Sequence, residues 1–458
     1  MAKAGLPQGT RDFSSEILKK RTYILETIKK IFQVYSFEPL ETPAIENIST
    51  LLGKYGDEGD KLIFKVLNNG LNDPKNIEKS KKGFEDLLAG KVSEDVTSRA
   101  LRYDLTIPLA RFVAMNFNNI YLPFKRYQIQ QVWRADRPQR GRYREFTQCD
   151  ADIVGSSSLS CEAELANIYH DVFAALGLNR YELKVNNRKV LAALARKCEG
   201  NNKLIPLTVA IDKLDKIGIE KVEEELKANG FTDEQVQIIK KFLDITGTNQ
   251  QKLDTLNEIF VNDEEGLTGV KELTNVIQHT KEVNISIDLT LARGLNYYTG
   301  VIFEAKAPKE VNMGSIGGGG RYDDLTGLFG VKNIPGVGIS FGVDRIYDVL
   351  EELNLFPKNI FFGPDVLFLN LGESESSKSM ELLKPLRKRN FSGEVFHEQT
   401  KIDKQMKYAD RKNFNFAAII GPEEFSQNMV TMKNLKTGEQ QKILQSELFN
   451  FLSKFLHK

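Results

Sequence analysis

The stretch WRADRPQRGRYREFTQCDADIVG, residues 133–155, carries five arginines in a chain whose formal net charge is only +1. A strand-like run, FKRYQIQQVWR (124–134), leads into it, and a second, YREFTQCDADIVG (143–155), leads out of it. Pro138 and Gly141 between the two runs are typical of a turn. The pattern therefore predicts an antiparallel hairpin with a long polar loop, and it raises the question of what the arginines bind.

Side chains alternate along a strand, which divides the second run between two faces. Guanidinium groups match phosphates, an aromatic ring suits a purine base, and carboxylates suit an ammonium or imidazole group. The same face is equally compatible with a solvent-exposed sheet edge whose charges form surface ion pairs, each of which stabilises the fold by only about 0–1 kcal/mol. The face by itself therefore leaves a ligand site and a solvated surface as open alternatives. Its members are Arg142, Arg144, Phe146, Gln148, Asp150 and Asp152.

Two glycine-rich stretches follow nearer the C-terminus. GSIGGGGRYDD (314–324) predicts either a tight turn or a close approach of the backbone to a ligand. In GVGISFGVDR (336–345) a strand leads through glycine into a helix whose first turn holds Arg345. A helix N-terminus favours anions, so an arginine there indicates an anion site, unless it pairs with an acid such as Asp348. Neither stretch fits a P-loop or the GxGxxG pattern, which excludes the two common nucleotide cradles.

Two further segments bring polar side chains together. LRYDLTIPLAR (101–111) places Arg102, Asp104 and Thr106 at alternating positions. LTLARGLNYYTGVIFE (289–304) places Arg293 near a tyrosine pair. Each signal is weak alone, because tyrosine pairs usually belong to a core and a D-x-T sequence often caps a helix or turn.

Composition limits the class of protein. A chain of 458 residues is too long for one hydrophobic core, and its 41% hydrophobic and 27% charged content is ordinary for a globular protein. The three cysteines form no CxxC pair, and the four histidines lie far apart, so no metal site is predicted. No signal-peptide core or membrane-length apolar run is present, and we expect a cytoplasmic protein with no membrane partner.

The order of helix and strand patterns along the chain predicts several structural regions. Ser14–Phe37 has a helical period with serines available as caps, and residues 71–98 read as a polar excursion. Residues from about 187 to 280 are mostly helical and form a separate insertion. After FPKNIFFGP (356–364), strands alternate with helices, which predicts a small α/β domain with a mainly parallel sheet.

Together these segments resemble the histidine–tRNA ligase family of class II aminoacyl-tRNA synthetases, over nearly the whole chain. SFEPLETPAIEN (36–47) is similar to motif 1, the opening arginine stretch to motif 2, and GVGISFGVDRI (336–346) to motif 3. LARGLNYYTGVIFE and GGGGRYDDL resemble the two histidine-specific segments, and PQGTRDF (7–13) the N-terminal signature. KQMKYADRK (404–412) and MKNLKTGEQ (432–440) resemble the anticodon-binding domain.

The resemblance implies an α+β fold with an antiparallel catalytic sheet. It assigns residues 1–186 and 281–358 to the catalytic core, 187–280 to a helical insertion, and 359–458 to an α/β anticodon-binding domain. It further implies a homodimer with Pro43 at the interface. The activity implied is ATP-dependent attachment of L-histidine to tRNA-His through histidyl-adenylate, with Mg²⁺ bridging the phosphates and no protein-only metal cage.

The same resemblance implies roles for individual residues. Arg134 and Arg293 would be the catalytic cations at the α-phosphate, Arg142 and Arg345 would hold the outer phosphates, and Phe146 would stack on adenine. Asp104, Thr106 and Gln148 would receive the ammonium group of histidine. Asp152 and Tyr298 would take the imidazole nitrogens, with Tyr297 and Tyr322 in the same pocket, and Arg137 and Gln139 are candidates for tRNA contact. The motif 2 acid is Asp136 where the family usually has Glu, and Asp104 is likewise one methylene shorter than the Glu of many bacterial members.

Two other classes stay open at this point. A non-catalytic regulatory paralogue of histidine biosynthesis shares the core, but it generally lacks the C-terminal domain and degrades the histidine-site residues. A plain nucleotide-binding module with no tRNA role is the other alternative. The basic run LKPLRKRN (383–390) argues against it, although such a run also suits one solvated helix face.

Overall fold

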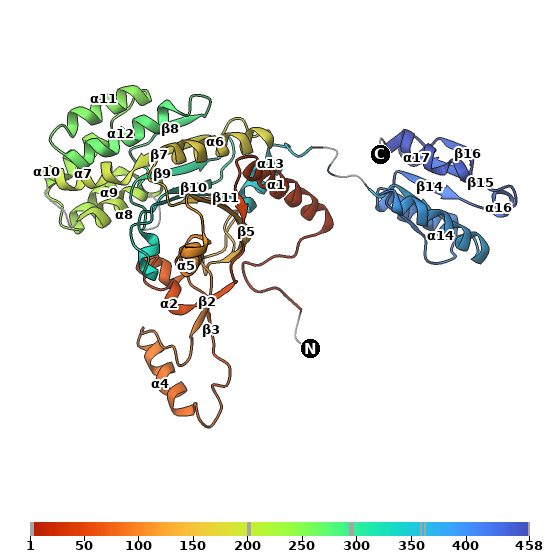
Figure 1. Ribbon diagram of the computed structural model, residues 1–458, viewed down its shortest axis with the longest axis horizontal. Helices are drawn as coiled ribbons and strands as arrows, with labels where there is room; N and C mark the ends of the chain where they lie inside the picture. The colour runs from red at the N-terminus through yellow and green to blue at the C-terminus, as the bar shows by residue number, and fades with distance from the viewer. Residues whose placement is uncertain (1–3, 199–202, 293–296, 358–359, 361–362, 457–458) are drawn as a thin grey trace. The chain divides into compact units, whose positions relative to one another are not determined.

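The computed structural model describes residues 4–198, 203–292, 297–357, 360 and 363–456. The chain divides into two compact units, Met1–Phe356 and Pro357–Lys458 (Figure 1). Both units combine helices with a sheet, so the predicted α+β class is confirmed. No helix in the described part of the chain is long and apolar enough to cross a bilayer.

An eight-stranded sheet organises the first unit, in the order β1-β5-β6-β11-β10-β9-β7-β8. Every neighbouring pair from β5 to β7 is antiparallel, whereas the edge pairs β1–β5 and β7–β8 are parallel. The predicted hairpin is confirmed as β5 and β6, with Arg126 opposite Asp152. The strands are β1 Glu38–Pro39, β5 Phe124–Trp133, β6 Glu145–Val154, β7 Glu182–Asn187, β8 Ile285–Ile287, β9 Val301–Lys306, β10 Ser315–Arg321 and β11 Gly336–Gly342.

Three helices cover one face of this sheet: α1 (Ser15–Val34), α6 (Ser160–Ala175) and α13 (Val343–Glu352). The predicted N-terminal helix is confirmed, and its Ser14 cap accepts a hydrogen bond from the Ile17 amide at 3.5 Å. The odd-numbered β6 residues Cys149, Ala151 and Ile153 are buried in the core beneath these helices. The even-numbered residues of β6 are therefore left for the opposite face.

The described residues between 188 and 278 form a run of helices that packs beside β7 through α12, and their status as a separate insertion stays a prediction. Capping boxes at Thr232 and Thr248, each with a glutamine three residues later, begin α10 and α11. The helices are α7 Arg188–Lys197, α8 Leu204–Asp212, α9 Leu214–Ala228, α10 Asp233–Leu243, α11 Asn249–Ile259 and α12 Glu264–Gln278.

The polar segment 71–98 contains helix α4 (Ile77–Leu88), which projects from the unit in Figure 1. Gly83 allows the helix to pack closely on the chain that follows it, since an added Cβ there would lie 2.5 Å from Val96. This close packing of helix on chain cannot be read from a polar composition. A small sheet, β2-β4-β3, lies at the base of the projection (Figure 1). The other local elements are β2 Ile45–Asn47, α2 Ile48–Leu51, α3 Gly56–Lys61, β3 Lys65–Val66, β4 Arg99–Leu101, α5 Thr106–Asn116, and the 3-10 turns Phe117–Asn119 and Leu325–Phe329.

The second unit has a five-stranded sheet in the order β13-β12-β14-β15-β16. Its first three strands are parallel, but β14–β15 and β15–β16 are antiparallel, so the expectation of a mainly parallel sheet is wrong. A hairpin that turns at Gly438, whose φ is 80°, makes β15–β16 antiparallel, and the chain reverses between β14 and β15 through the short helix Pro422–Ser426. The elements are β12 Val366–Phe368, α14 Glu373–Lys388, β13 Gly393–Val395, α15 Ile402–Arg411, β14 Phe416–Ile419, α16 Pro422–Ser426, β15 Met429–Asn434, β16 Gln440–Leu444, the 3-10 turn Gln445–Glu447 and α17 Leu448–Leu456.

Candidate active site

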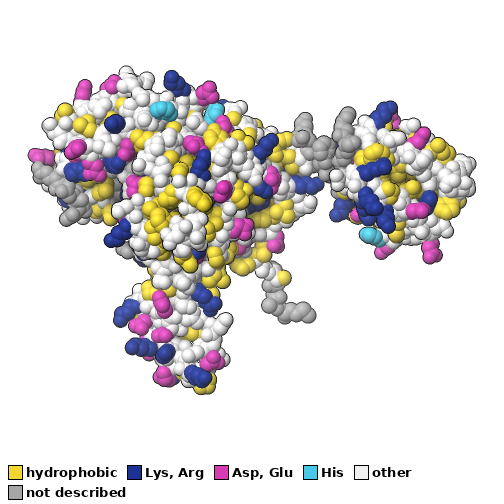
Figure 2. Space-filling view, viewed as in Figure 1, with side chains coloured by type: hydrophobic (Ala, Val, Ile, Leu, Met, Phe, Trp, Pro, Cys, Tyr) yellow, Lys and Arg dark blue, Asp and Glu magenta, His cyan; other side chains and the backbone are white. Residues whose placement is uncertain are grey.

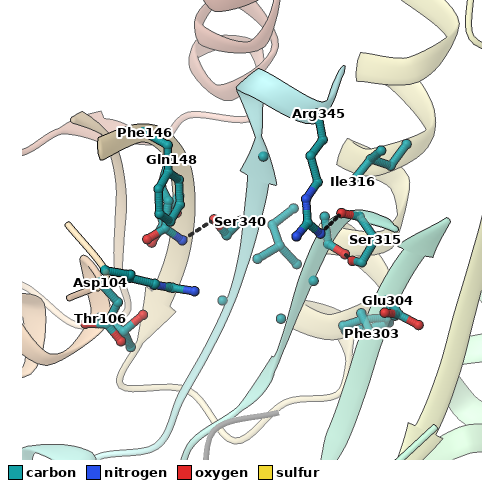
Figure 3. Close-up of a pocket in the computed structure, with 18 of the residues that line it drawn as sticks. Asp104, Thr106, Phe146, Gln148, Phe303, Glu304, Ser315, Ile316, Ser340 and Arg345 are labelled. Atoms are coloured by element: carbon teal, nitrogen blue, oxygen red, sulfur yellow. Dashed lines mark hydrogen bonds between the residues drawn. The ribbon is translucent and has the colours of Figure 1, made fainter. Parts of the chain in front are cut away.

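A cavity of about 400 Å³ opens on the sheet face opposite the α1–α6–α13 layer (Figure 3). Strands β6, β10 and β11 form its floor, and the β5–β6 loop and the first turns of α5 and α13 contribute to its walls. The cavity brings together all of the predicted ATP- and histidine-binding residues that the structure describes. They are Asp104, Thr106, Arg134, Arg142, Phe146, Gln148, Asp152, Tyr297, Tyr298, Tyr322 and Arg345.

The remaining predicted residues lie elsewhere. Arg137 and Gln139 are exposed in the β5–β6 loop and do not line the cavity. Gln139 instead exchanges backbone hydrogen bonds of 3.1 and 2.9 Å with Arg142, which closes the loop tip. Arg293, the other predicted catalytic cation, lies outside the described residues.

The alternation predicted for β6 holds from Phe146 to Asp152, whose even-numbered residues line the cavity. It does not extend to Arg144, because β6 begins only at Glu145. The Arg144 side chain instead donates from Nε to the Asp136 carbonyl at 3.1 Å. This arginine therefore helps to shape the loop.

Asp152 is buried at the floor of the cavity and is held from two sides. Tyr322 donates its hydroxyl to Oδ1 at 2.5 Å, and Arg126 Nη2 lies 2.9 Å from Oδ2. Gly338 lies opposite on β11, where an added Cβ would stand 2.0 Å from Oδ1. Burial raises the pKa of Asp152, and the positive charge of Arg126 opposes that shift.

Asp104 forms a second buried carboxylate just before helix α5. Its Oδ1 accepts hydrogen bonds from the Tyr55 hydroxyl at 3.0 Å and the Ile107 amide at 3.2 Å. Its Oδ2 accepts one from the Tyr297 hydroxyl at 3.2 Å. Burial raises the pKa of Asp104, whereas these donors and Arg134 lower it. The tyrosine at 297 thus contributes to the site as well as to packing.

Gln148 on β6 and Ser340 on β11 are diagonal neighbours across the two strands, and their side chains point toward each other (Figure 3). Gln148 donates from Nε2 to the Ser340 hydroxyl at 2.8 Å, which turns the amide so that Oε1 is a buried acceptor without a hydrogen bond from any described residue. Asp150, which pairs with Ser340 across the strands, also has an unbonded oxygen, Oδ1, within the described structure. Burial raises the pKa of Asp150 to about 7. The result is a row of acceptors suited to a donor-rich ligand.

The cations line other parts of the same cavity. Arg134 lies over the rings of Tyr103 and Phe146, at 4.2 and 5.2 Å from their centroids. Arg345, in the first turn of α13, donates to the Gly141 and Ser315 carbonyls at 2.7 and 2.5 Å. These bonds join the helix to both the loop and β10, and Figure 3 shows Arg345 on the opposite side of Ser340 from Asp104.

Arg142 is the most solvent-exposed of the three, with 44% of its side chain accessible. Its guanidinium lies 3.7 Å from Asp136, the acid that departs from the family pattern. Asp136, although one methylene shorter than the Glu usual in the family, therefore still lies near Arg142.

The glycine stretch is a central strand, β10, and the turn alternative is wrong. An added Cβ at Gly319 would lie 2.2 Å from the Gly338 carbonyl, and one at Gly320 would lie 2.7 Å from that of Val301. The glycines allow β10 to pack this closely between its neighbours. The other alternative, a close approach of backbone to a ligand, stays a prediction, and residues 317–319 do line the cavity.

Sequence reasoning missed three functional candidates: Arg126, Ser340 and Asp344. Asp344 lines the cavity and accepts from Arg21 at 2.5 Å, from Arg11, and from the Thr147 amide at 3.3 Å. Ser340 alternates with Gly338 in GVGISFG, and this spacing could have placed it on the cavity face. No sequence signal distinguishes Arg126 from a surface arginine.

Comparisons with known proteins agree with this geometry. A family model described as histidyl-tRNA synthetase matches residues 88–346, and an anticodon binding domain model matches residues 365–455. The histidine–tRNA ligase of Christiangramia forsetii is 49% identical, covering 96% of each chain. That of Bacteroides fragilis is 48% identical, covering 99% of this chain and 100% of its own. A crystal structure of histidyl-tRNA synthetase from a Nostoc species superposes with a TM-score of 0.79 at 30% identity, covering 99% of this chain and 100% of that chain. The chain belongs to the histidyl-tRNA synthetase family.

Proposed function

We propose that the cavity binds ATP and L-histidine together, forms histidyl-adenylate, and passes the histidyl group to tRNA-His. The observation that carries this proposal is the division of one cavity between buried acceptors and arginines. Such a site can hold a cationic amino acid and a polyanion with their reacting groups side by side. Positioning and electrostatic stabilisation then account for most of the rate enhancement.

Histidine would bind at the acceptor side. Its ammonium group has three N–H donors, which match Asp104, Thr106 and the free Oε1 of Gln148. Its imidazole would donate to Asp152 and contact the Tyr298 hydroxyl, with Tyr297 and Tyr322 behind them. A buried polar site of this kind rejects analogues without the ring nitrogens by about 10⁴–10⁵-fold, so selection needs no editing step.

ATP would bind at the arginine side. Phe146 would stack on adenine, Arg142 and Arg345 would hold the outer phosphates, and Arg134 would lie between the α-phosphate and the histidine carboxylate. The carboxylate oxygen attacks the α-phosphorus, and the bond from that phosphorus to pyrophosphate breaks. Two anions must approach each other in this step, and guanidinium groups keep their charge at any working pH. The resemblance gives Arg293 the same role.

The transfer step would use the tRNA bound to both units. A ribose hydroxyl of the terminal adenosine attacks the activated carbonyl, and AMP leaves. Arg137 and Gln139, exposed beside the cavity in the β5–β6 loop, are our candidates for contact with the acceptor end.

The second unit would bind the anticodon. Figure 2 shows lysine and arginine side chains on its visible face. Helix α14 supplies Lys384, Arg387 and Lys388 to a groove of this unit. Basic side chains of this kind bind the nucleic-acid backbone.

Mg²⁺ fits as an ion that arrives with ATP. Within the described residues, no three His, Cys, Asp or Glu side chains gather in a metal-binding arrangement. The ion commonly keeps water and phosphate ligands and adds only one or two carboxylates, and Glu304 is a carboxylate that lines the cavity (Figure 3). It would neutralise phosphate charge while the arginines orient the nucleotide.

We further propose a homodimer with Pro43 at the interface, a cytoplasmic location, and the division into core, insertion and anticodon-binding parts given above. Sedimentation of the purified chain would test the first of these. A species at the monomer mass of 51.9 kDa under assay conditions would contradict it.

The decisive test is histidine-dependent exchange of pyrophosphate into ATP, followed by charging of tRNA-His. A catalytic chain performs both reactions, a plain nucleotide-binding module performs neither, and exchange without charging would contradict the tRNA role. The regulatory paralogue is not favoured, because the relatives that match nearly the whole chain are named histidine–tRNA ligase.

A further inference from the structure

A fully buried arginine, Arg126, lies beneath the proposed histidine side of the cavity. It belongs to β5, directly opposite Asp152 on β6, and has no solvent exposure. Its Nη2 lies 2.9 Å from Asp152 Oδ2 and donates to the Leu105 carbonyl at 3.2 Å. Arg126 itself does not line the cavity, so it can reach a ligand only through Asp152.

Arg321 provides a comparison within the same unit, because it forms another buried pair with a carboxylate. Its Nε and Nη2 lie 2.5 and 2.8 Å from the two oxygens of Glu162. Its Nη1 donates to the Ser156 carbonyl at 3.1 Å, so every nitrogen has an acceptor. A buried ion pair needs such a complete set of hydrogen bonds if its only role is to stabilise the fold.

Arg126 differs, since its Nε and Nη1 are buried and receive no hydrogen-bond acceptor from the part of the chain that is described. Unbonded buried donors weaken a fold, so stability alone does not explain this arginine. Its position, however, supplies a positive charge beside buried carboxylates. Asp104, Asp150 and Asp152 are all buried at this side of the cavity, and Arg126 is in contact with one of them, Asp152.

The charge of Arg126 decides what Asp152 can do. Burial raises the pKa of Asp150 and of Asp152, and Arg126 opposes the shift in both. Without the guanidinium, Asp152 would hold a proton more readily and would present a hydroxyl to the ligand in place of a carboxylate. A ring N–H of histidine would then lose its acceptor.

We propose that Arg126 is a positioning residue for histidine selection, which keeps the Asp152 carboxylate charged and aimed into the cavity. The inference rests on the proposed function, in which Asp152 receives the imidazole. It adds to the site a residue that touches neither substrate.

A double-mutant cycle tests the proposal, with pyrophosphate exchange giving the KM for histidine and for ATP. Arg126→Leu should raise the histidine KM roughly 10- to 100-fold and leave the ATP KM nearly unchanged, because a charge-assisted contact is lost at one substrate only. In an Asp152→Asn background the same substitution should add less than about threefold, since coupled residues are not additive. Arg126→Lys, which keeps the charge, should restore part of the histidine affinity.

Arg321→Leu is the matched control, and should lower the melting temperature without a selective change in the histidine KM. Equal rises in both KM values for Arg126→Leu, or full additivity with Asp152→Asn, would overturn the proposal. If Arg126→Leu does not fold, the same KM measurements are made on Arg126→Lys and Arg126→Gln. A rise in the histidine KM alone, larger for Gln than for Lys, supports the proposal. A Gln variant without a selective rise in the histidine KM refutes it. Failure of the unmodified chain to exchange with histidine would instead refute the proposed function.

Discussion

The two sides of the cavity are built differently. The acceptor side consists of Asp104, Asp150 and Asp152, which are 2–3% exposed and lie on β6 or at the start of α5. The arginine side includes Arg142, whose side chain is 44% exposed on a loop, and Arg345 at a helix terminus. We infer that the histidine side is assembled before ligand arrives, whereas the triphosphate side takes its final arrangement around ATP.

Asp152→Asn should give the largest effect on this comparison. The variant keeps the shape of the side chain but removes the charge that would accept the imidazole and pair with Arg126. We expect the histidine KM to rise roughly 10²–10³-fold, with the ATP KM within about threefold of the parent value. Pyrophosphate exchange at varied histidine and varied ATP measures both. Equal changes in the two values would show that the sides are not separate.

Arg345→Ala is the counterpart on the arginine side. Loss of the guanidinium that we propose to contact phosphate should raise the ATP KM roughly 10- to 100-fold and leave histidine binding in the absence of ATP unchanged. Equilibrium binding of histidine by calorimetry, alongside exchange kinetics, separates the two effects. A variant that loses histidine binding to the same degree would contradict the assignment.

Gly338→Ala would sharpen the claim that the histidine side is prebuilt. The new methyl group would stand 2.0 Å from Asp152 Oδ1, so the carboxylate must move. We expect a histidine KM higher by about 10-fold and a free energy of unfolding lower by about 1–3 kcal/mol. In the control Gly5→Ala, at a position outside the cavity lining, no atom of the described residues stands within 4 Å of the added Cβ, and the histidine KM should stay close to the parent value.

Asp150→Asn should give the smallest effect on activity and a distinct effect of pH on stability. Because burial raises the pKa of Asp150 to about 7 from an ordinary value of 3.8, the folded state binds its proton more tightly than the unfolded state. The free energy of unfolding should therefore fall as pH rises from about 4 to 7 and level off above that range. Asparagine should flatten this fall, as measured by chemical denaturation at pH 5 and pH 8. A fall of unchanged size would show that Asp150 does not cause it.

The sequence was sufficient to predict those elements in which hydrophobic and polar residues follow a single helix or strand period. The β5–β6 hairpin, α1 with its Ser14 cap, and the strand-to-helix junction before Arg345 all follow from spacing and turn residues. The cavity face of β6 from Phe146 onward also follows from alternation. Its identity as part of a binding site required the other motifs, because a solvated sheet edge has the same pattern.

Tertiary packing decided the features that the sequence could not predict. Four consecutive glycines look like a turn, but they form a strand, and at Gly317, Gly319 and Gly320 an added Cβ would lie only 2.2–2.7 Å from a neighbouring atom. Helix α4 packs through Gly83 against Val96, and the last strand pair of the second sheet, β15–β16, is antiparallel because the chain turns at Gly438. Arg126 acquires its significance only from the strand register that sets it opposite Asp152.

The glycine strand β10 also has a consequence for inhibitor resistance. A compound that makes its contacts with the backbone of residues 317–319 would meet a surface without side chains, so no contacting side chain could be removed by mutation. Any replacement there adds atoms, and at Gly319 the first added atom would lie 2.2 Å from the Gly338 carbonyl. A variant that escapes such a compound through a new side chain at Gly319 would therefore also have to displace the backbone of β11.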